Sequence, residues 1–212
     1  MTLEKCIEEF VEKTPFKEPV TTDEIYEYVL SKIPSANKAS FNSSLQRFEK
    51  SSPDFARYKK GIYFKKKQTL FGETGISIIG LIRKTYLFDG DDIIGFERGP
   101  SFMNKIGLTT QIPRYLYLAT MKTRYSRIDK EFSVCLSKPV TEINKENYHY
   151  LQFLDVLQNK DEVNIEVGNP LEVMRGLMEK LSLSPEKLVF YAKFYKSMQV
   201  YTGLSDILGG TP

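Results

Sequence analysis

Apolar side chains recur at helical spacing in three stretches of the first 51 residues. Each stretch has a single apolar face, which is the pattern of a helix that packs on a core. The stretches lie at 3–13, 20–33 and 35–50, and Pro34 separates the second from the third. Their apolar positions are Leu3, Ile7, Phe10 and Val11; Ile25, Tyr28, Val29 and Ile33; and Phe41, Leu45 and Phe48. We therefore predict three helices at the start of the chain.

A hairpin is predicted directly after these helices, in the stretch FARYKKGIYFKKK (55–67). Two short aromatic-rich segments flank a Lys-Lys-Gly turn, where Gly61 can adopt the positive φ that tight hairpin turns need. Three helices followed by a hairpin is the order of a winged helix-turn-helix. We assign residues 1–70 to such a domain and expect a linker within 65–75.

The remainder, 71–212, has the mixed pattern of an α/β domain. A helix is predicted within 75–87, and a turn followed by a second helix within 93–108, where Gly107 is a stop signal. RYLYLAT (114–120) and EFSVCLS (131–137) have the composition and length of strands in a central sheet.

The C-terminal third is predicted to be helical. Apolar spacing indicates helices within 144–159, 169–181 and 184–198, and the last begins with Ser184 as cap and Pro185 at the first helical position. The predicted fold class is α+β: an N-terminal winged helix-turn-helix followed by a mixed α/β domain with a helical C-terminus.

Composition is that of a folded soluble protein, which we expect to be cytoplasmic. Hydrophobic residues make up 41% of the 212 residues and charged residues 27%. The acidic, amphipathic start does not have the pattern of a signal peptide, and no apolar run reaches the roughly 20 residues of a membrane helix. Cys6 and Cys135 lie far apart without metal-ligand spacing, so we expect reduced, mostly packed thiols.

Charge is distributed unevenly along the chain. The formal net charge is only +3, but 38–67 contains nine cations and two anions, which leaves a net charge of −4 on the other residues. Such a local excess favours contact with a polyanion. The cations are Lys38, Arg47, Lys50, Arg57, Lys59, Lys60, Lys65, Lys66 and Lys67.

The expected partner is double-stranded DNA. On the third helix the polar face opposite Phe41 and Leu45 can enter a major groove, and the lysines of the hairpin can neutralise phosphates. The alternative is a solvated helix face beside a hairpin whose lysines protect an edge strand. The predicted DNA-binding residues are Asn42, Ser43, Gln46, Arg47, Lys50, Arg57, Lys59, Lys60, Lys65, Lys66 and Lys67.

Catalytic constellations are sparse, and we expect no catalytic residue, cofactor or metal. The single histidine, His149, lies between tyrosines on a predicted helix and is interpreted as a packed or surface residue. The carboxylates Asp89, Asp91 and Asp92 could bind Mg²⁺ in a nucleotidyl-transfer or nuclease enzyme, but Asp-Gly-Asp is also common in turns. We favour the turn and keep the enzyme as an alternative.

The stretch GFERGPSFMNKIGLTTQIPRYLYLATMKT (95–123) resembles the second domain of AbiEi-type antitoxins, which belong to type IV (abortive infection) toxin-antitoxin systems. YKKGIYFKKKQTLFGE (58–73) is similar to the wing and the following linker of that family. The resemblance covers roughly residues 5–160. Residues of the motif include Asn104, Thr109, Thr110, Gln111 and Pro113, for which we expect structural roles at the end of the preceding helix and before the next strand.

The resemblance implies an antitoxin that represses its own operon through the winged helix and counteracts a toxin of nucleotidyltransferase type. Members of this family are typically not enzymes. A single winged helix reads few base pairs, so we expect a homodimer on an inverted repeat. A third interpretation, from a different class, is a winged-helix module that binds another protein.

Overall fold

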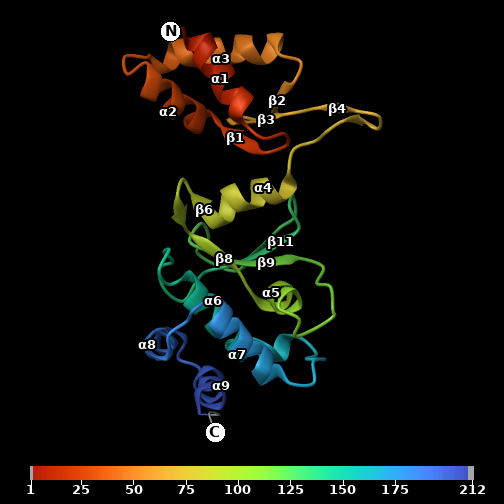
Figure 1. Ribbon diagram of the computed structural model, residues 1–212, viewed down its shortest axis with the longest axis vertical. Helices are drawn as coiled ribbons and strands as arrows, with labels where there is room; N and C mark the ends of the chain where they lie inside the picture. The colour runs from red at the N-terminus through yellow and green to blue at the C-terminus, as the bar shows by residue number, and fades with distance from the viewer. Residues whose placement is uncertain (1, 210–212) are drawn as a thin grey trace. The chain divides into compact units, whose positions relative to one another are not determined.

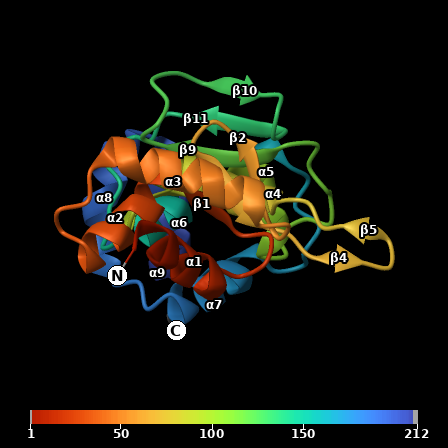
Figure 2. The ribbon, with the colours of Figure 1, turned by 90° about the horizontal axis from the view of Figure 1, so that it is seen from above.

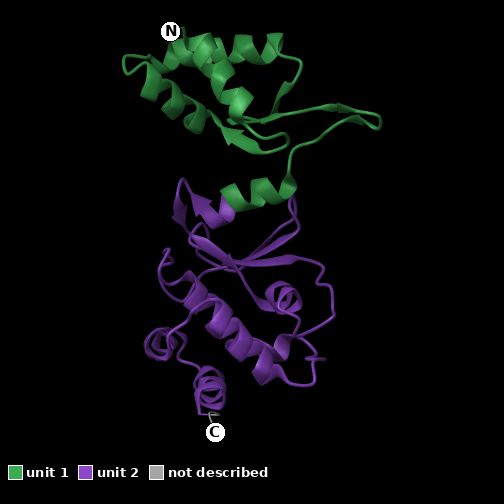
Figure 3. Cartoon of the chain, in the orientation of Figure 1, with its two compact units in different colours: residues 1–84 green, residues 85–212 purple. Residues whose placement is uncertain are grey.

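The computed structural model describes residues 2–209 and divides into two compact units, Met1–Lys84 and Thr85–Pro212 (Figure 3). Both units combine helices with small sheets, so the predicted α+β class is confirmed. The division falls after Lys84, whereas we expected it after residue 70. No helix within 2–209 is both long and apolar enough to cross a membrane.

The first unit contains three helices and a three-stranded antiparallel sheet. The helices are α1 (Leu3–Lys13), α2 (Thr22–Lys32) and α3 (Lys38–Ser51), and the strands are β1 (Pro19–Thr21), β2 (Phe55–Lys59) and β3 (Ile62–Lys65). The sheet order is β1-β3-β2. The three predicted helices and the predicted hairpin are confirmed, and β1 is a strand that the sequence pattern did not indicate.

Side-chain caps fix where these helices begin. Thr21 and Glu24 form a capping box at α2, and the side chain of Asn37 accepts hydrogen bonds from the amides of Ala39 and Ser40 at α3. The apolar faces meet in one core that includes Ile7, Ile25 and Phe41, each with no exposed surface. Cys6 lies in this core as a free thiol, and Cys135 of the second unit is a half-buried free thiol.

The stretch expected as a linker forms a second hairpin, β4 (Gln68–Thr69) with β5 (Gly72–Glu73), in place of an irregular connection. It extends away from the three helices in both ribbon views (Figures 1 and 2). The predicted helix within 75–87 is present as α4 (Ile78–Ile82) followed by a π-helical segment (Arg83–Leu87). The backbone of α4 lies against Pro19, because a Cβ on Gly80 would come within 2.7 Å of its Cδ, and this contact joins α4 to the first unit.

The second unit is built on a four-stranded sheet of order β10-β11-β9-β8. Its strands are β8 (Gly95–Glu97), β9 (Leu116–Thr120), β10 (Arg127–Asp129) and β11 (Val134–Ser137), and β9 and β11 run parallel. The two predicted strands are therefore confirmed, at shorter length. A separate two-stranded turn, β6 (Phe88–Asp89) with β7 (Asp92–Ile93), precedes the sheet, and α5 (Gly99–Lys105) lies between β8 and β9.

The C-terminal part is helical, and its first helix is buried against β8, α5 and two of the later helices (Figure 1). The helices are α6 (Tyr148–Gln158), α7 (Pro170–Lys180), α8 (Pro185–Tyr195) and α9 (Met198–Leu208), with a short 3-10 turn at Lys160–Glu162. Residues 150–157 of α6 are all buried. The three predicted helices are confirmed, with Ser184 as the cap of α8, but the last ends at Tyr195 because Lys196 is left-handed (φ 49°) and α9 follows as a separate helix.

The backbone carbonyls at the end of α5 accept hydrogen bonds from other groups than we expected. The amides of Gly107 (φ 82°) and Leu108 donate to the carbonyls of Asn104 and Met103, so the Thr-Thr-Gln stretch is not needed for this purpose. The amide of Thr110 donates instead to Glu166 at 2.9 Å. Pro113 precedes β9, as expected, although the strand begins only at Leu116.

Candidate nucleic-acid interface

One face of α3 is polar and exposed along its length. Asn42, Ser43, Gln46 and Lys50 are exposed, whereas Phe41 and Leu45 on the opposite face are buried. Positions 39, 43, 46 and 50 recur at helical spacing, so they form a continuous stripe of small and hydrogen-bonding side chains. The Ser43 hydroxyl donates to the Ala39 carbonyl at 3.1 Å, and among residues 2–209 the side chains of Gln46 and Lys50 form no hydrogen bond or ion pair.

Arg47 differs from its neighbours on α3 because it is held against α1. Its guanidinium lies 3.4 Å from the carboxylate of Glu4 and donates to the Ser44 hydroxyl at 3.2 Å. The side chain is 69% exposed, so this pair is a weak one in water. Arg47 therefore lies at the edge of the polar stripe with part of its charge already balanced.

The β2–β3 hairpin presents its cations at the turn. Arg57, Lys59 and Lys60 are exposed, and Gly61 has the expected positive φ of 80°. The carbonyl of Gly61 accepts a hydrogen bond from the amide of Thr22 at 2.9 Å, which fixes the turn to the start of α2.

Aromatic packing supports the base of this hairpin. The rings of Phe55 and Tyr63 stack with centroids 5.3 Å apart. Burial raises the pKa of the Tyr63 phenol, and the charge of Arg57 on the facing strand offsets part of that shift. The hydroxyl is therefore neutral near pH 7, and the hairpin offers only positive charge at its turn.

Lys65 and Lys66 are half-buried, and their ammonium groups contact other residues of the same unit. The Lys65 ammonium donates to the Glu12 carbonyl at 3.3 Å and lies 4.8 Å from the ring centroid of Phe16. Lys66 forms an ion pair with Glu73 at 2.8 Å, and its side chain is only 23% exposed. Lys67 is exposed. Of the three consecutive lysines, which the sequence could not distinguish, only Lys67 is presented outward.

The tip of the β4–β5 hairpin carries two fully exposed apolar side chains. The exposed fractions of Leu70 and Phe71 are 101% and 100%. The tip has a defined shape, because the Thr69 hydroxyl donates to the Gly72 carbonyl at 2.7 Å and Gly72 has a φ of 106°. We did not predict these residues from the sequence. The pair Leu-Phe before a glycine, within an otherwise polar stretch, could have indicated an exposed apolar turn.

The acidic residues near position 90 form a turn. Asp89 and Asp92 face each other across β6 and β7, and Gly90 between them has a φ of 58°. The carboxylate of Asp89 accepts from the Lys122 ammonium at 2.7 Å. Within residues 2–209 no group of three or more His, Cys, Asp and Glu side chains is placed to hold a metal ion. Residues 89–92 therefore adopt the turn that their sequence favours.

His149 lies half-buried on α6, and its ring centroid is 3.8 Å from that of Tyr148. Packing of this histidine agrees with the sequence-based interpretation.

A comparison with protein-family models finds no family that matches the chain, and a comparison with curated proteins finds no match either.

Proposed function

We propose that the chain is a DNA-binding transcriptional regulator that resembles the antitoxin of a type IV toxin-antitoxin system. The observation that carries the proposal is the exposed polar stripe of α3 in the same unit as a basic hairpin. A helix with small and amide side chains can read base edges, and nearby cations supply affinity for the phosphates.

The connectivity of the first unit supports this proposal. Its order is helix, strand, helix, helix, strand, strand, and β1 pairs with β3 to give the sheet order β1-β3-β2. This is the arrangement expected of a winged helix-turn-helix, in which the second helix of the helix-turn-helix reads the major groove. In that arrangement α2 and α3 are the helix-turn-helix, and α3 is the reading helix.

The proposed contacts divide by chemistry. Asn42, Ser43 and Gln46 face bases. The outward cations contact phosphates, and Lys65 and Lys66 add only to the local field because their ammonium groups are already engaged. These outward cations are Lys50, Arg57, Lys59, Lys60 and Lys67.

The β4–β5 hairpin extends the proposed interface. It follows β3 directly, so it takes the place of a second wing. Apolar side chains inserted between base steps are a recurrent means of binding the minor groove. Leu70 and Phe71, fully exposed at the end of a ribbon that begins after Lys67, have the chemistry for such an insertion.

Autorepression and neutralisation of a nucleotidyltransferase-type toxin rest on the resemblance of 95–123 to the family. Two copies on an inverted repeat would be required to read a full operator. Coexpression with the product of the neighbouring gene tests the toxin: restored growth and copurification support the antitoxin role, and an unchanged growth defect contradicts it.

Binding of the full chain to the DNA upstream of its own gene tests the regulator. Fluorescence anisotropy against scrambled duplex, at several salt concentrations, should show specific and salt-sensitive binding. Gln46→Ala should reduce discrimination between the two duplexes by about 1 to 3 kcal/mol, whereas Lys59→Glu with Lys60→Glu should weaken binding to both. Lys145→Glu in the second unit is the control. Equal, weak binding to any duplex would contradict the proposal.

A further inference from the structure

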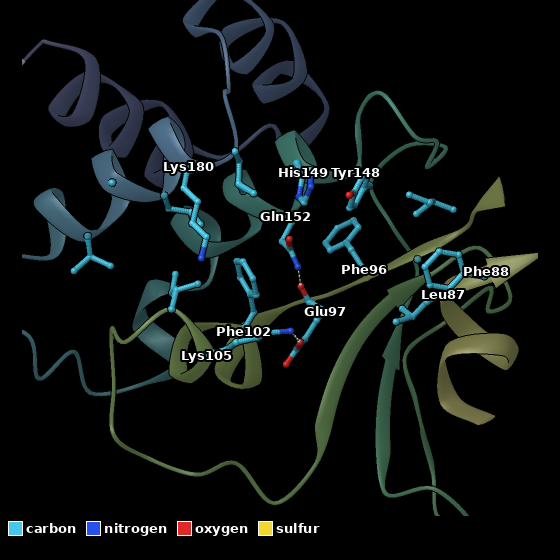
Figure 4. Close-up of a pocket in the computed structure, with 17 residues that line it drawn as sticks. Leu87, Phe88, Phe96, Glu97, Phe102, Lys105, Tyr148, His149, Gln152 and Lys180 are labelled. Atoms are coloured by element: carbon cyan, nitrogen blue, oxygen red, sulfur yellow. Dashed lines mark hydrogen bonds and ion pairs between the residues drawn. The ribbon is translucent and has the colours of Figure 1, made fainter. Parts of the chain in front are cut away.

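The second unit contains a cavity of about 550 Å³ between the sheet and the helices α5, α6 and α7 (Figure 4). This volume lies within the range of sites that hold small organic molecules. The cavity is unrelated to the proposed DNA interface, since every residue that lines it belongs to 87–181. A ligand bound in this cavity therefore does not depend on the proposed DNA-binding function.

The walls of the cavity are mainly apolar and partly aromatic. Phe96 on β8 and Phe102 on α5 contribute rings, and Ile106, Leu177 and Leu181 contribute aliphatic surface. In Figure 4 the two rings come from different elements and border the same space. Such a lining favours a ligand with a planar apolar body, because aromatic rings pack well against other rings.

The charged groups at the cavity leave one cation without an acidic partner. Glu97 and Lys105 pair with each other at 3.0 Å, and the Gln152 amide donates to the Glu97 carbonyl at 2.7 Å. Lys180 also lines the cavity and extends from α7 toward Phe102 in Figure 4. Among the residues that the structure describes, no carboxylate pairs with Lys180. The lining therefore has a net positive charge.

His149 adds a neutral polar group. Burial lowers the pKa of its imidazole, and an interaction with Gln152 offsets part of the shift. Its Nδ1 is enclosed and has no hydrogen-bond partner within residues 2–209. Neutral His149 does not compete with Lys180 for an anion, so the charge of the ligand is set by Lys180.

We propose that this cavity binds a small aromatic carboxylate. The ring lies against the apolar walls, and the carboxylate pairs with the ammonium of Lys180. A charge-assisted hydrogen bond at the edge of an apolar cavity gives both affinity and orientation. A phosphate-rich ligand fits less well, because the lining offers a single unpaired cation and mostly apolar surface.

Gly176 is an exposed position at the rim of the cavity, where a larger side chain can be added without a clash. It lies on α7 among the lining residues, and a Cβ at this position would meet no atom within 4 Å. Leucine has a much higher helix propensity than glycine, so Gly176→Leu keeps α7 and places a side chain in open space. Loss of binding in this variant with an unchanged or higher melting temperature reports occlusion rather than unfolding.

The probes for the test are 1-naphthoate and its neutral analogue 1-naphthamide, titrated into the full chain by isothermal titration calorimetry. We expect saturable binding of the acid, at least about fivefold tighter than the amide. Lys180→Met should remove the preference for the acid and leave binding of the amide unchanged, whereas Gly176→Leu should weaken both by at least about tenfold. Lys145→Met, at an exposed position outside the cavity, should behave as wild type.

Each other outcome overturns part or all of the proposal. Absence of saturable binding of either probe below about 10 mM, or binding that Gly176→Leu leaves unchanged, removes the cavity as a ligand site. Equal affinities for acid and amide in the wild-type chain remove the carboxylate assignment, and so does a preference that survives Lys180→Met.

Discussion

The single histidine of the chain has an environment that disfavours its charge. His149 is half-buried on α6 with its ring beside that of Tyr148, and Lys180, which pairs with no carboxylate among residues 2–209, lines the same cavity. Removal of imidazolium from water is the main reason that the pKa of His149 is lowered from its usual 6.5. The residue is therefore neutral at physiological pH and can titrate only in mild acid.

We expect an NMR titration of the His149 Hε1 signal to have its midpoint below 6.5. The unfolded chain binds a proton near pH 6.5 and the folded chain only at lower pH. The free energy of unfolding should therefore fall as the pH drops below 6.5, until the folded-state pKa is passed. Urea unfolding between pH 7.5 and 5.5 measures this, and His149→Gln should lose the contribution of this residue. A midpoint at or above 6.5 would contradict the argument.

The sequence predicted the conformation or packing of a residue correctly where its immediate neighbours in the chain determine it. The positive φ of Gly61 and the packing of His149 followed from turn chemistry and from flanking tyrosines. Lys65 and Lys66 show the limit, because their partners Glu12, Phe16 and Glu73 are brought to them by the fold. No pattern of spacing along the chain distinguishes these two lysines from Lys67.

At the scale of elements, periodicity predicted α1 to α3 and α6 to α8, but it missed α9, although Val200, Leu204 and Ile207 give that helix a buried apolar face. It missed β1, whose three residues are a strand only because β3 lies beside them. It also missed the β4–β5 hairpin, since two-residue strands are too short to show alternation. A short strand is stabilised by the neighbouring strand with which it pairs, and the hydrophobic pattern of the short segment does not show which segment that is.

The capping box of α2 should make a measurable contribution to stability. The amide of Glu24 donates to the Thr21 hydroxyl at 3.1 Å, and the Glu24 carboxylate accepts from the Thr21 amide at 2.7 Å. Thr21→Val keeps the shape and removes the hydroxyl, so we expect the free energy of unfolding to fall by about 1 kcal/mol. Thr21→Ser, which retains the hydroxyl, is the control for urea unfolding. Equal stability of the valine and serine variants would exclude the cap as the cause.

The hairpin tip should affect DNA affinity without affecting stability. Leu70 and Phe71 are fully exposed, so replacement of both by serine should change the free energy of unfolding by less than about 0.5 kcal/mol. If the tip enters the minor groove, the same change should weaken DNA binding by at least about 1 kcal/mol. The matched control is Ile112→Ser, since Ile112 is 89% exposed in the second unit. Equal affinities of the three proteins would remove the tip from the interface.

At the scale of the whole molecule, the uneven distribution of charge was predictable and its effective size was not. Sequence counting gives an excess of seven positive charges over 38–67. In the structure Lys38, Arg47 and Lys66 have carboxylate partners in the same unit, and the Lys65 ammonium is engaged by a carbonyl. We assign to phosphates the five other cations, whose side chains are exposed, and their number sets the response of binding to salt.

We expect the logarithm of the DNA association constant to fall with the logarithm of salt concentration with a slope of about −4 to −5, since roughly 0.9 counterions are released per phosphate contact and five cations face outward. Lys60→Ala should reduce the magnitude of this slope by about 0.9. Lys66→Ala should reduce it much less, because Glu73 already balances that charge. The sequence treats these two lysines as equal, so the comparison tests the structural assignment itself. Equal reductions would mean that the Lys66–Glu73 pair opens on DNA and that the local charge count, rather than the geometry of the unbound chain, determines affinity.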